Sequence, residues 1–158
     1  WPDAVTLGIA DLVRRHEAVF RLLRILVETA PVKRGSGDLV RRSARLAPAL
    51  AYIHDHLCDS IAVEDLAEAT GVSASRLFAL FADHLGMTPM RYVKQVRLAT
   101  AAHELTHSPE PIAEISRRMG FATPFHFSRE FKTAFGMSPS RFRQDHRVKA
   151  AMAADDAD

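Results

Sequence analysis

The chain has 158 residues, of which 47% are hydrophobic, and a formal net charge of +2. That length suits one domain with additional helices, and the single cysteine excludes an internal disulfide and is typical of a reducing compartment. No apolar run approaches the roughly 20 residues of a membrane span, and nothing resembles a secretory signal, so we expect a cytoplasmic protein that does not enter a membrane. Because the chain begins with Trp1 rather than methionine, we expect a fragment or a processed product.

Positive charge is concentrated in the second half of the chain. Residues 71–149 contain 12 lysines and arginines against 6 aspartates and glutamates, whereas residues 150–158 contain three aspartates and no basic residue. A surface that binds phosphates needs such a basic excess. A merely solvated basic face gives the same count, so charge alone does not decide between the two.

The N-terminal part of the chain predicts amphipathic helices and then a linker. Over residues 4–29, apolar residues recur at helical spacing with arginines between them. These helices carry more apolar surface than a lone helix hides, and packing on the domain that follows is one way to bury it. Residues 31–44 contain proline, two glycines and serines and are interpreted as a linker, with helix resuming near Asp38.

Residues 45–57 form the next expected helix, which brings His54 and Cys58 within four residues of each other. Two such side chains share one helix face and are able to share a metal ion. No further ligand stands at a recognisable spacing. We therefore interpret both as structural residues and expect neither a metal site nor a cofactor.

Val63–Thr70 and residues 74–85 predict a first pair of short helices. Ala62 offers the first helix no side-chain cap, Gly71 makes the turn, and Ser73 caps the second helix. The inward positions of the second helix are Leu77, Phe81 and Leu85. Two short helices joined at a glycine are typical of a helix-turn-helix. A long helix then starts at Thr88-Pro89 and extends to about His107.

A second pair of short helices follows over residues 112–119 and 124–135. Gly120 breaks the first helix, and Thr123-Pro124 starts the second. Phenylalanines at 127, 131 and 135 place one face of the second helix in the core. Ser138-Pro139 starts a last helix that is expected to end near His146. Its arginines at 141, 143 and 147 are expected to face solvent or DNA, and residues 148–158 are expected to form a disordered tail.

The two pairs of helices are copies of one pattern. Before the turn, matching residues such as Gly71 and Gly120 lie 49 positions apart, and after it they lie 50 apart, as Gly86 and Gly136 do. One inserted residue in the second turn explains the change. Further pairs are Leu77 with Phe127, Phe81 with Phe131, Leu85 with Phe135, Pro89 with Pro139, Arg91 with Arg141 and Tyr92 with Phe142. Matching apolar faces, glycine stops and helix starts predict two modules of one kind.

On these motifs, residues 46–147 resemble the DNA-binding domain of the AraC/XylS family of bacterial transcription regulators. The second copy carries the resemblance most closely, in Gly120-Phe121, in Phe127-Ser128-Arg129 and in the run from Gly136 to Arg143. The resemblance implies an all-α fold of two helix-turn-helix modules joined by a long linker helix and preceded by amphipathic helices. The implied parts are a sensor or dimerisation remnant at 1–30, a linker at 31–44, the double helix-turn-helix domain at 45–147 and a tail at 148–158.

The resemblance also implies partners and contact residues. The partners are double-stranded DNA, RNA polymerase, a small-molecule effector bound by a sensor domain outside this chain, and a second copy of the chain through residues 4–29. Recognition helices at 74–85 and 124–135 would read adjacent major-groove segments. Candidates to face bases are Ser75, Arg76, Ala79, Thr123, Phe125, His126 and Arg129. Candidates to contact phosphates are Ser73, Thr88, Arg91, Lys132, Ser138 and Arg141.

Several candidates permit two interpretations. Arg76 and Arg129 suit either a guanine edge or a phosphate, and Phe125 suits thymine methyl groups or a sugar. His126 stands where relatives often have tyrosine, and it either packs or contacts a phosphate. Phe78, on the first recognition helix, belongs to the core or faces bases.

We interpret the chain as a sequence-specific transcription regulator and not an enzyme. The alternative is a protein-interaction module that retains the fold but not specific DNA reading, because the surface around Ser75, Ala79 and Pro124 offers few polar groups. A repair enzyme that uses Cys58 as nucleophile is disfavoured, because no base and no nucleophile motif accompany this cysteine.

Overall fold

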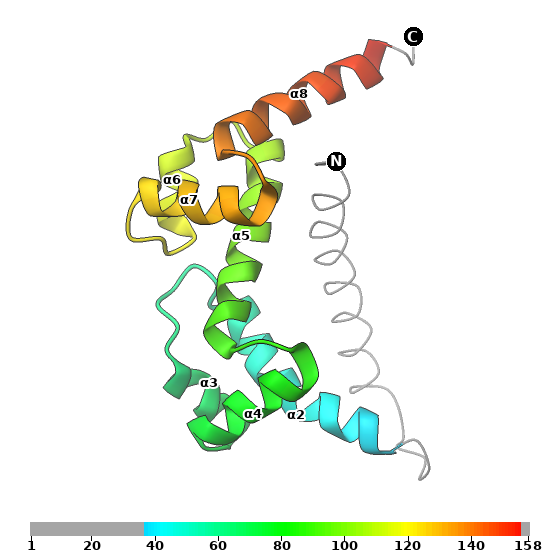
Figure 1. Ribbon diagram of the computed structural model, residues 1–158, viewed down its shortest axis with the longest axis vertical. Helices are drawn as coiled ribbons and strands as arrows, with labels where there is room; N and C mark the ends of the chain where they lie inside the picture. Colours follow the sequence, from blue (N-terminus) through cyan, green and yellow to red (C-terminus); the bar gives the residue numbers. More distant parts are fainter. Residues whose placement is uncertain (1–36, 156–158) are drawn as a thin grey trace. The chain divides into compact units, whose positions relative to one another are not determined.

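The computed structural model describes the backbone of residues 37–155 and the side chains of residues 45–148, and over these residues the regular elements are all helices. They are α2 (Gly37–Asp55), α3 (Val63–Thr70), α4 (Ala74–Leu85), α5 (Pro89–His107), α6 (Ile112–Arg118), α7 (Pro124–Phe135) and α8 (Pro139–Asp155), as Figure 1 shows. The all-α class is confirmed for this part of the chain. None of these helices has the length and apolar character to cross a membrane. The amphipathic helices expected over 4–29 lie outside the described residues.

Helix α2 begins at Gly37, so the expected return of helix near Asp38 is confirmed. The last part of the expected linker is therefore helical rather than extended. The cause is local, because leucine, arginine and alanine, which favour helices, follow Gly37 without a further glycine. The next proline, Pro48, lies inside α2.

The described residues form two compact units, which divide between Gln95 and Val96 within α5. In the first unit α2, α3 and α4 pack on one another. Its buried apolar side chains include Leu46, Ile53, Leu66, Leu77, Leu80, Phe81 and Val93. Phe81 meets Tyr92 edge-on at 5.9 Å, and burial raises the pKa of Tyr92 to about 12. Leu85 is only half-buried, so its expected place in the core is corrected.

The second unit has an aromatic core. Phe127, Phe131 and Phe135 line one face of α7 and are buried, as their spacing predicted. Phe131 lies 5.4 Å from Phe127, 4.4 Å from Phe135 and 5.3 Å from Phe142 between ring centroids. This core is completed by Leu98 and Leu105 of α5, Ile115 of α6, and Met119, which follows α6.

Helix α8 extends further than the sequence analysis expected. It runs from Pro139 to Asp155, past the expected end near His146 and through most of the expected disordered tail. The residues after Lys149 are mainly alanine and methionine, and alanine has the highest helix propensity of all residues. No glycine or proline interrupts them before Asp155, so nothing in this stretch stops the helix.

Candidate nucleic-acid interface

The turns of the two helix-turn-helix modules have the same hydrogen bonds. Gly71 donates to the Glu68 carbonyl at 3.0 Å, and Gly120 donates to the Arg117 carbonyl at the same distance. The residue after each glycine donates to the carbonyl five residues before it, at 3.1 Å in both turns. Both glycines have positive φ, 65° and 69°, which only glycine adopts without strain. The repeat seen in the sequence is therefore a repeat of backbone geometry.

Both recognition helices start with a side-chain cap. The Ser73 hydroxyl accepts from the Arg76 amide at 3.3 Å, and the Thr123 hydroxyl accepts from the His126 amide at 3.1 Å. The caps expected at both positions are confirmed. At Ala62, before α3, the expected weak cap is also found. There the Asp65 carboxylate accepts from the Ala62 amide at 2.7 Å and stabilises the helix start from inside.

The helices that follow the recognition helices are capped in the same way. The Thr88 hydroxyl accepts from the Arg91 amide at 3.3 Å, and the Ser138 hydroxyl accepts from the Arg141 amide at 3.4 Å. Three of the phosphate candidates, Ser73, Thr88 and Ser138, are therefore helix caps. Each hydroxyl keeps its hydrogen for donation to an anion, because capping uses the oxygen as an acceptor.

The first recognition helix, α4, exposes a small set of side chains at its N-terminal half. Ser75 and Arg76 are exposed, and Ala79 is half-buried. Phe78 is 41% exposed, so it does not belong to the core. This surface combines one charged group with a hydroxyl and apolar groups.

The second recognition helix, α7, exposes a different set. Phe125 is 79% exposed, and Thr123 lies at the helix start, also exposed. Arg129, one turn after Phe125, has a side chain that is 65% exposed. Because positions four apart share a helix face, Phe125 and Arg129 form one surface.

His126 contacts an aromatic ring of the turn and a carboxylate of α7. Its ring meets Phe121 edge-on at 5.9 Å, and its Nε2 lies 3.7 Å from a carboxylate oxygen of Glu130. The same carboxylate lies 3.7 Å from the Arg129 guanidinium. The side chain of Glu130 is 19% exposed and orients both neighbours. The packing interpretation of His126 thus has a partner in the structure, and its exposed portion remains accessible for a phosphate.

The remaining phosphate candidates are exposed cations. Arg91, Lys132 and Arg141 all lie on the surface of their helices. Arg141 has an ion pair with Asp145 at 3.8 Å, which is too long and too exposed to hold it firmly.

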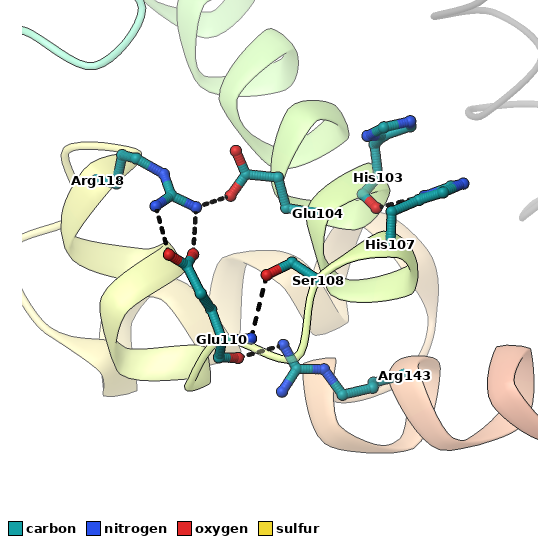
Figure 2. A network of polar contacts seen from close by, with 7 residues as sticks. All are labelled: His103, Glu104, His107, Ser108, Glu110, Arg118 and Arg143. Carbon is teal, nitrogen blue, oxygen red and sulfur yellow. Dashed lines mark hydrogen bonds and ion pairs between the residues drawn. The ribbon is translucent and has the colours of Figure 1, made fainter.

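A network of polar contacts stabilises the second module (Figure 2). The sequence analysis did not predict it. Arg118 pairs with Glu104 and binds Glu110 through two hydrogen bonds, 3.1 and 2.5 Å long. Arg143 donates from Nε to the Leu105 carbonyl at 3.1 Å and from Nη2 to the Glu110 carbonyl at 2.6 Å. The bonds from Arg118 hold the pKa of Glu110 below its ordinary value, against the opposing effect of burial. They also raise the pKa of Arg118.

Arg143 was expected to face solvent or DNA, and the structure corrects this. Its guanidinium satisfies a carbonyl in the last turn of α5, where no intrahelical partner is available. A signal was present in the sequence. Arg143 matches Val93 at the offset of 50, and Val93 is a buried residue of the first module. An arginine at an inward position therefore needs an internal partner.

The residues considered for metal or nucleophilic chemistry form no site in the described part of the chain. His54 and Cys58 are both exposed, and His56 bonds Asp59 at 3.2 Å. Among the described residues, no three His, Cys, Asp or Glu side chains lie close enough to hold a metal ion. A hollow of about 320 Å³ lies beside the turn of the second module, lined by α6 and the start of α7. Its lining includes the hydroxyl-bearing Ser116 and is otherwise mostly apolar.

The helix-turn-helix domain family matches residues 66–145, which is half of the chain. The chain belongs to the AraC/XylS family of helix-turn-helix proteins. The HTH-type transcriptional activator RhaS of Salmonella arizonae is 33% identical over 135 residues, which are 85% of this chain and 48% of RhaS. The chain thus spans about half the length of the curated relatives that it matches.

Solved structures with AraC-type domains share this fold. A regulator from Chromobacterium violaceum is 27% identical with a TM-score of 0.64, over 66% of this chain and 93% of that one. The C-terminal domain of AraT, a response regulator from Geobacillus stearothermophilus, is 32% identical with a TM-score of 0.62, over 66% of this chain and 88% of that one. The DNA-binding domain of AdpA, solved with a target DNA, is 27% identical with a TM-score of 0.63, over 66% of this chain and 95% of that one.

Membership of the AraC/XylS family confirms two expectations. The double helix-turn-helix fold is that of a DNA-binding domain of transcription regulators, and this domain is not an enzyme.

Proposed function

We propose that this AraC/XylS-type chain is a sequence-specific DNA-binding transcription regulator, in which α4 and α7 read adjacent segments of the major groove. The observation that carries the proposal is the duplicated framework. Each module repeats the same turn and cap hydrogen bonds and exposes the N-terminal half of its second helix. In helix-turn-helix proteins that half contacts base edges.

The exposed side chains suit direct reading. We assign Arg129 of α7 and Arg76 of α4 to guanine edges, which present two acceptors that a guanidinium binds together. Ser75 offers a hydroxyl beside Arg76, and Ala79 suits contact with a thymine methyl. Thr123 and His126 stand beside Phe125 at the start of α7 and complete the base-facing set.

The capping residues and exposed cations suit phosphate binding. Ser73, Thr88 and Ser138 each start a helix, where the backbone amides and the helix dipole attract an anion. Arg91, Lys132 and Arg141 add positive charge in the same modules. Such contacts set the register on the duplex without reading its sequence.

The length of α5 supports reading of adjacent segments. Its 19 residues, at 1.5 Å per residue, give a helix of about 28 Å. Successive major-groove segments on one side of B-DNA lie about 34 Å apart. In this proposal α5 sets the distance between the two segments, and that distance becomes part of the specificity.

Further partners belong to the same proposal. RhaS is named a transcriptional activator, which favours activation, with RNA polymerase as the partner. A small-molecule effector would act through a sensor domain, and a second copy of the chain would pair through residues 4–29. A regulator of this kind works on the chromosome, so we place the protein in the cytoplasm.

Selection of bound duplexes from a random library, with the salt dependence measured on the enriched sequence, tests the proposal. We expect two short segments about one helical turn apart and a steep loss of affinity as salt rises. A single enriched segment contradicts reading by both modules. The absence of any enrichment favours the protein-interaction alternative.

An arginine variant sharpens the same test. Loss of a bidentate guanine contact costs about 1–3 kcal/mol and relaxes the preference at one position. Arg129→Ala should therefore weaken binding about fivefold or more and broaden one position of the second segment. Arg45→Ala, which removes an exposed arginine of α2, is the control and should leave the sequence preference intact. An unchanged preference in Arg129→Ala contradicts direct reading by α7.

A further inference from the structure

The start of α7 presents an apolar tip, formed by Ala122, Pro124 and Phe125. All three residues are exposed, and Phe125 is the most exposed large apolar side chain among the described residues, at 79%. An isolated apolar side chain on a surface is ordinary, but neighbouring exposed apolar residues at one point mark a contact surface. The apolar tip is therefore a candidate contact surface.

The apolar tip has little capacity for hydrogen bonding. Pro124 has no amide hydrogen, and the Thr123 hydroxyl, which lies within the tip, accepts from the His126 amide at 3.1 Å and keeps only its hydrogen for donation. Alanine, proline and phenylalanine side chains offer neither donor nor acceptor. These three side chains therefore cannot read the donor and acceptor pattern by which most base edges are distinguished.

One feature of the major groove is apolar, and it is the methyl group at C5 of a pyrimidine. Thymine carries it, cytosine does not, and phenylalanine is among the side chains that contact it. We propose that Phe125 reads pyrimidine 5-methyl groups, so that this chain binds sites whose second segment carries thymine or 5-methylcytosine at a defined position. The inference rests on the proposed function, because it requires α7 to enter the major groove.

Arg129 complements this reading without duplicating it. It lies one helical turn after Phe125 on the same face and is 65% exposed. An arginine detects guanine by hydrogen bonds, whereas the apolar tip detects a methyl group by burial. The second segment should therefore contain a methylated pyrimidine and a guanine, read by separate side chains.

The module repeat has an exposed phenylalanine at the first turn of α7 and not at the first turn of α4. The position that matches Phe125 in α4 is Ser75, a polar residue. The exposed phenylalanine of α4 is Phe78, which matches Ser128 and lies later in its helix, at 41% exposure. Methyl reading at the first turn of the recognition helix is thus a feature of the second module.

The experiment uses the enriched duplex and replaces each thymine in turn by uracil, which removes only the methyl group. Burial of one methyl corresponds to about a fourfold change in affinity. We expect a loss of about fourfold at one thymine of the second segment. Replacement of that thymine by cytosine and by 5-methylcytosine separates the two sources of the methyl group, and 5-methylcytosine should bind more tightly than cytosine.

Variants assign the effect to Phe125. Phe125→Ala should bind the thymine and uracil duplexes equally, whereas Phe125→Leu, which stays apolar, should keep a preference for thymine. Phe125 is outside the core, so neither change should unfold the protein. Phe78→Ala is the matched control and should leave the preference at the second segment unchanged.

Each outcome decides the inference. Specific binding with no response to uracil at any position of the second segment overturns methyl reading by α7 and leaves the proposed function standing. A response to uracil at the second segment that persists in Phe125→Ala overturns the assignment to Phe125. The absence of an enriched duplex overturns both the proposed function and this inference.

Discussion

The two helix-turn-helix modules share their backbone geometry. They differ in the side chains that form their cores and in those that they expose. Glycine, serine, threonine and proline at matched positions produce the same turns and caps in both. The core of the first module is mainly aliphatic, with Phe81 against Tyr92. In the second module four phenylalanine rings contact one another around Phe131. The backbone geometry thus depends on a few residues at the turns and helix caps, while the side chains between them differ.

The contacts that stabilise the two modules at the matched positions 93 and 143 also differ. In the first module Val93 is buried as an apolar side chain. At the matched position of the second module, Arg143 binds two carbonyls, and Arg118 with its two glutamates lies beside them. The second module therefore relies on charge where the first relies on apolar burial, and this makes the two separable by experiment.

The largest expected effect is on the aromatic core. Phe131→Ala should lower the free energy of unfolding by about 3–5 kcal/mol, because it removes a fully buried ring. Phe81→Ala should cost less within the same range, since among the described residues Phe81 has one ring partner and each ring pair adds about 0.5–1.5 kcal/mol. Urea denaturation measures the free energy of unfolding of the wild type and both variants.

Amide hydrogen exchange shows which module is affected by each core variant. Phe131→Ala should speed exchange in α7 more than in α4, and Phe81→Ala should do the reverse. Phe125→Ala is the control, because its exposed ring should change stability by no more than about 0.5 kcal/mol. Equal costs for Phe81→Ala and Phe131→Ala would remove the difference in core packing between the modules.

An intermediate effect is expected at Arg143. Hydrogen bonds from a charged group contribute about 1.5–3 kcal/mol, and Arg143 is half-buried with two of them. Arg143→Ala should therefore destabilise the protein by about 2 kcal/mol in urea denaturation. Arg143→Val, which installs the residue type of the first module, should cost a similar amount because both carbonyls lose their donor. Arg141→Ala, an exposed neighbour, is the control. If Arg143→Val leaves the stability unchanged, the apolar burial of the first module and the hydrogen bonds of the second are interchangeable.

The sequence predicted well the helix starts and ends, which depend on neighbouring residues. The starts of α4 and α7 follow from Ser73 and Thr123-Pro124, and their ends follow from Gly86 and Gly136, because caps and left-handed glycines act within one helical turn. The buried faces followed from helical periodicity. Exposure at Phe125 was also expected, since it lies outside the spacing of 127, 131 and 135.

The contacts between distant residues were not predictable from local pattern. Arg143 and Glu110 lie 33 positions apart, and Arg118 and Glu104 lie 14 apart. Each of these residues is ordinary for a solvated helix face, so only the folded chain shows that they meet. The length of α8 was missed for another reason, because its alanines offered no periodic apolar face to extend the prediction.

The smallest expected effect is the acid sensitivity of the second module. Arg118 lowers the pKa of Glu110 from its ordinary value of 4.5 in the folded state. The unfolded state therefore takes up the proton first as the pH falls. The stabilisation is complete above pH 4.5 and is lost as the pH drops through the lowered pKa of the folded state. The first module has Ile61, a buried apolar residue, at the position that matches Glu110.

Urea denaturation of the wild type and Glu110→Gln between pH 7 and pH 3 measures this contribution. The variant should be less stable at pH 7, and the gap should close on acidification because the wild type loses a stabilisation that the glutamine never had. Glu68→Gln on α3 removes the same charge outside the network and controls for net charge. If the difference in free energy of unfolding between the wild type and Glu110→Gln stays constant over this range, the pKa of Glu110 is the same in the folded and unfolded states. The two modules then do not differ in their reliance on charge at this position.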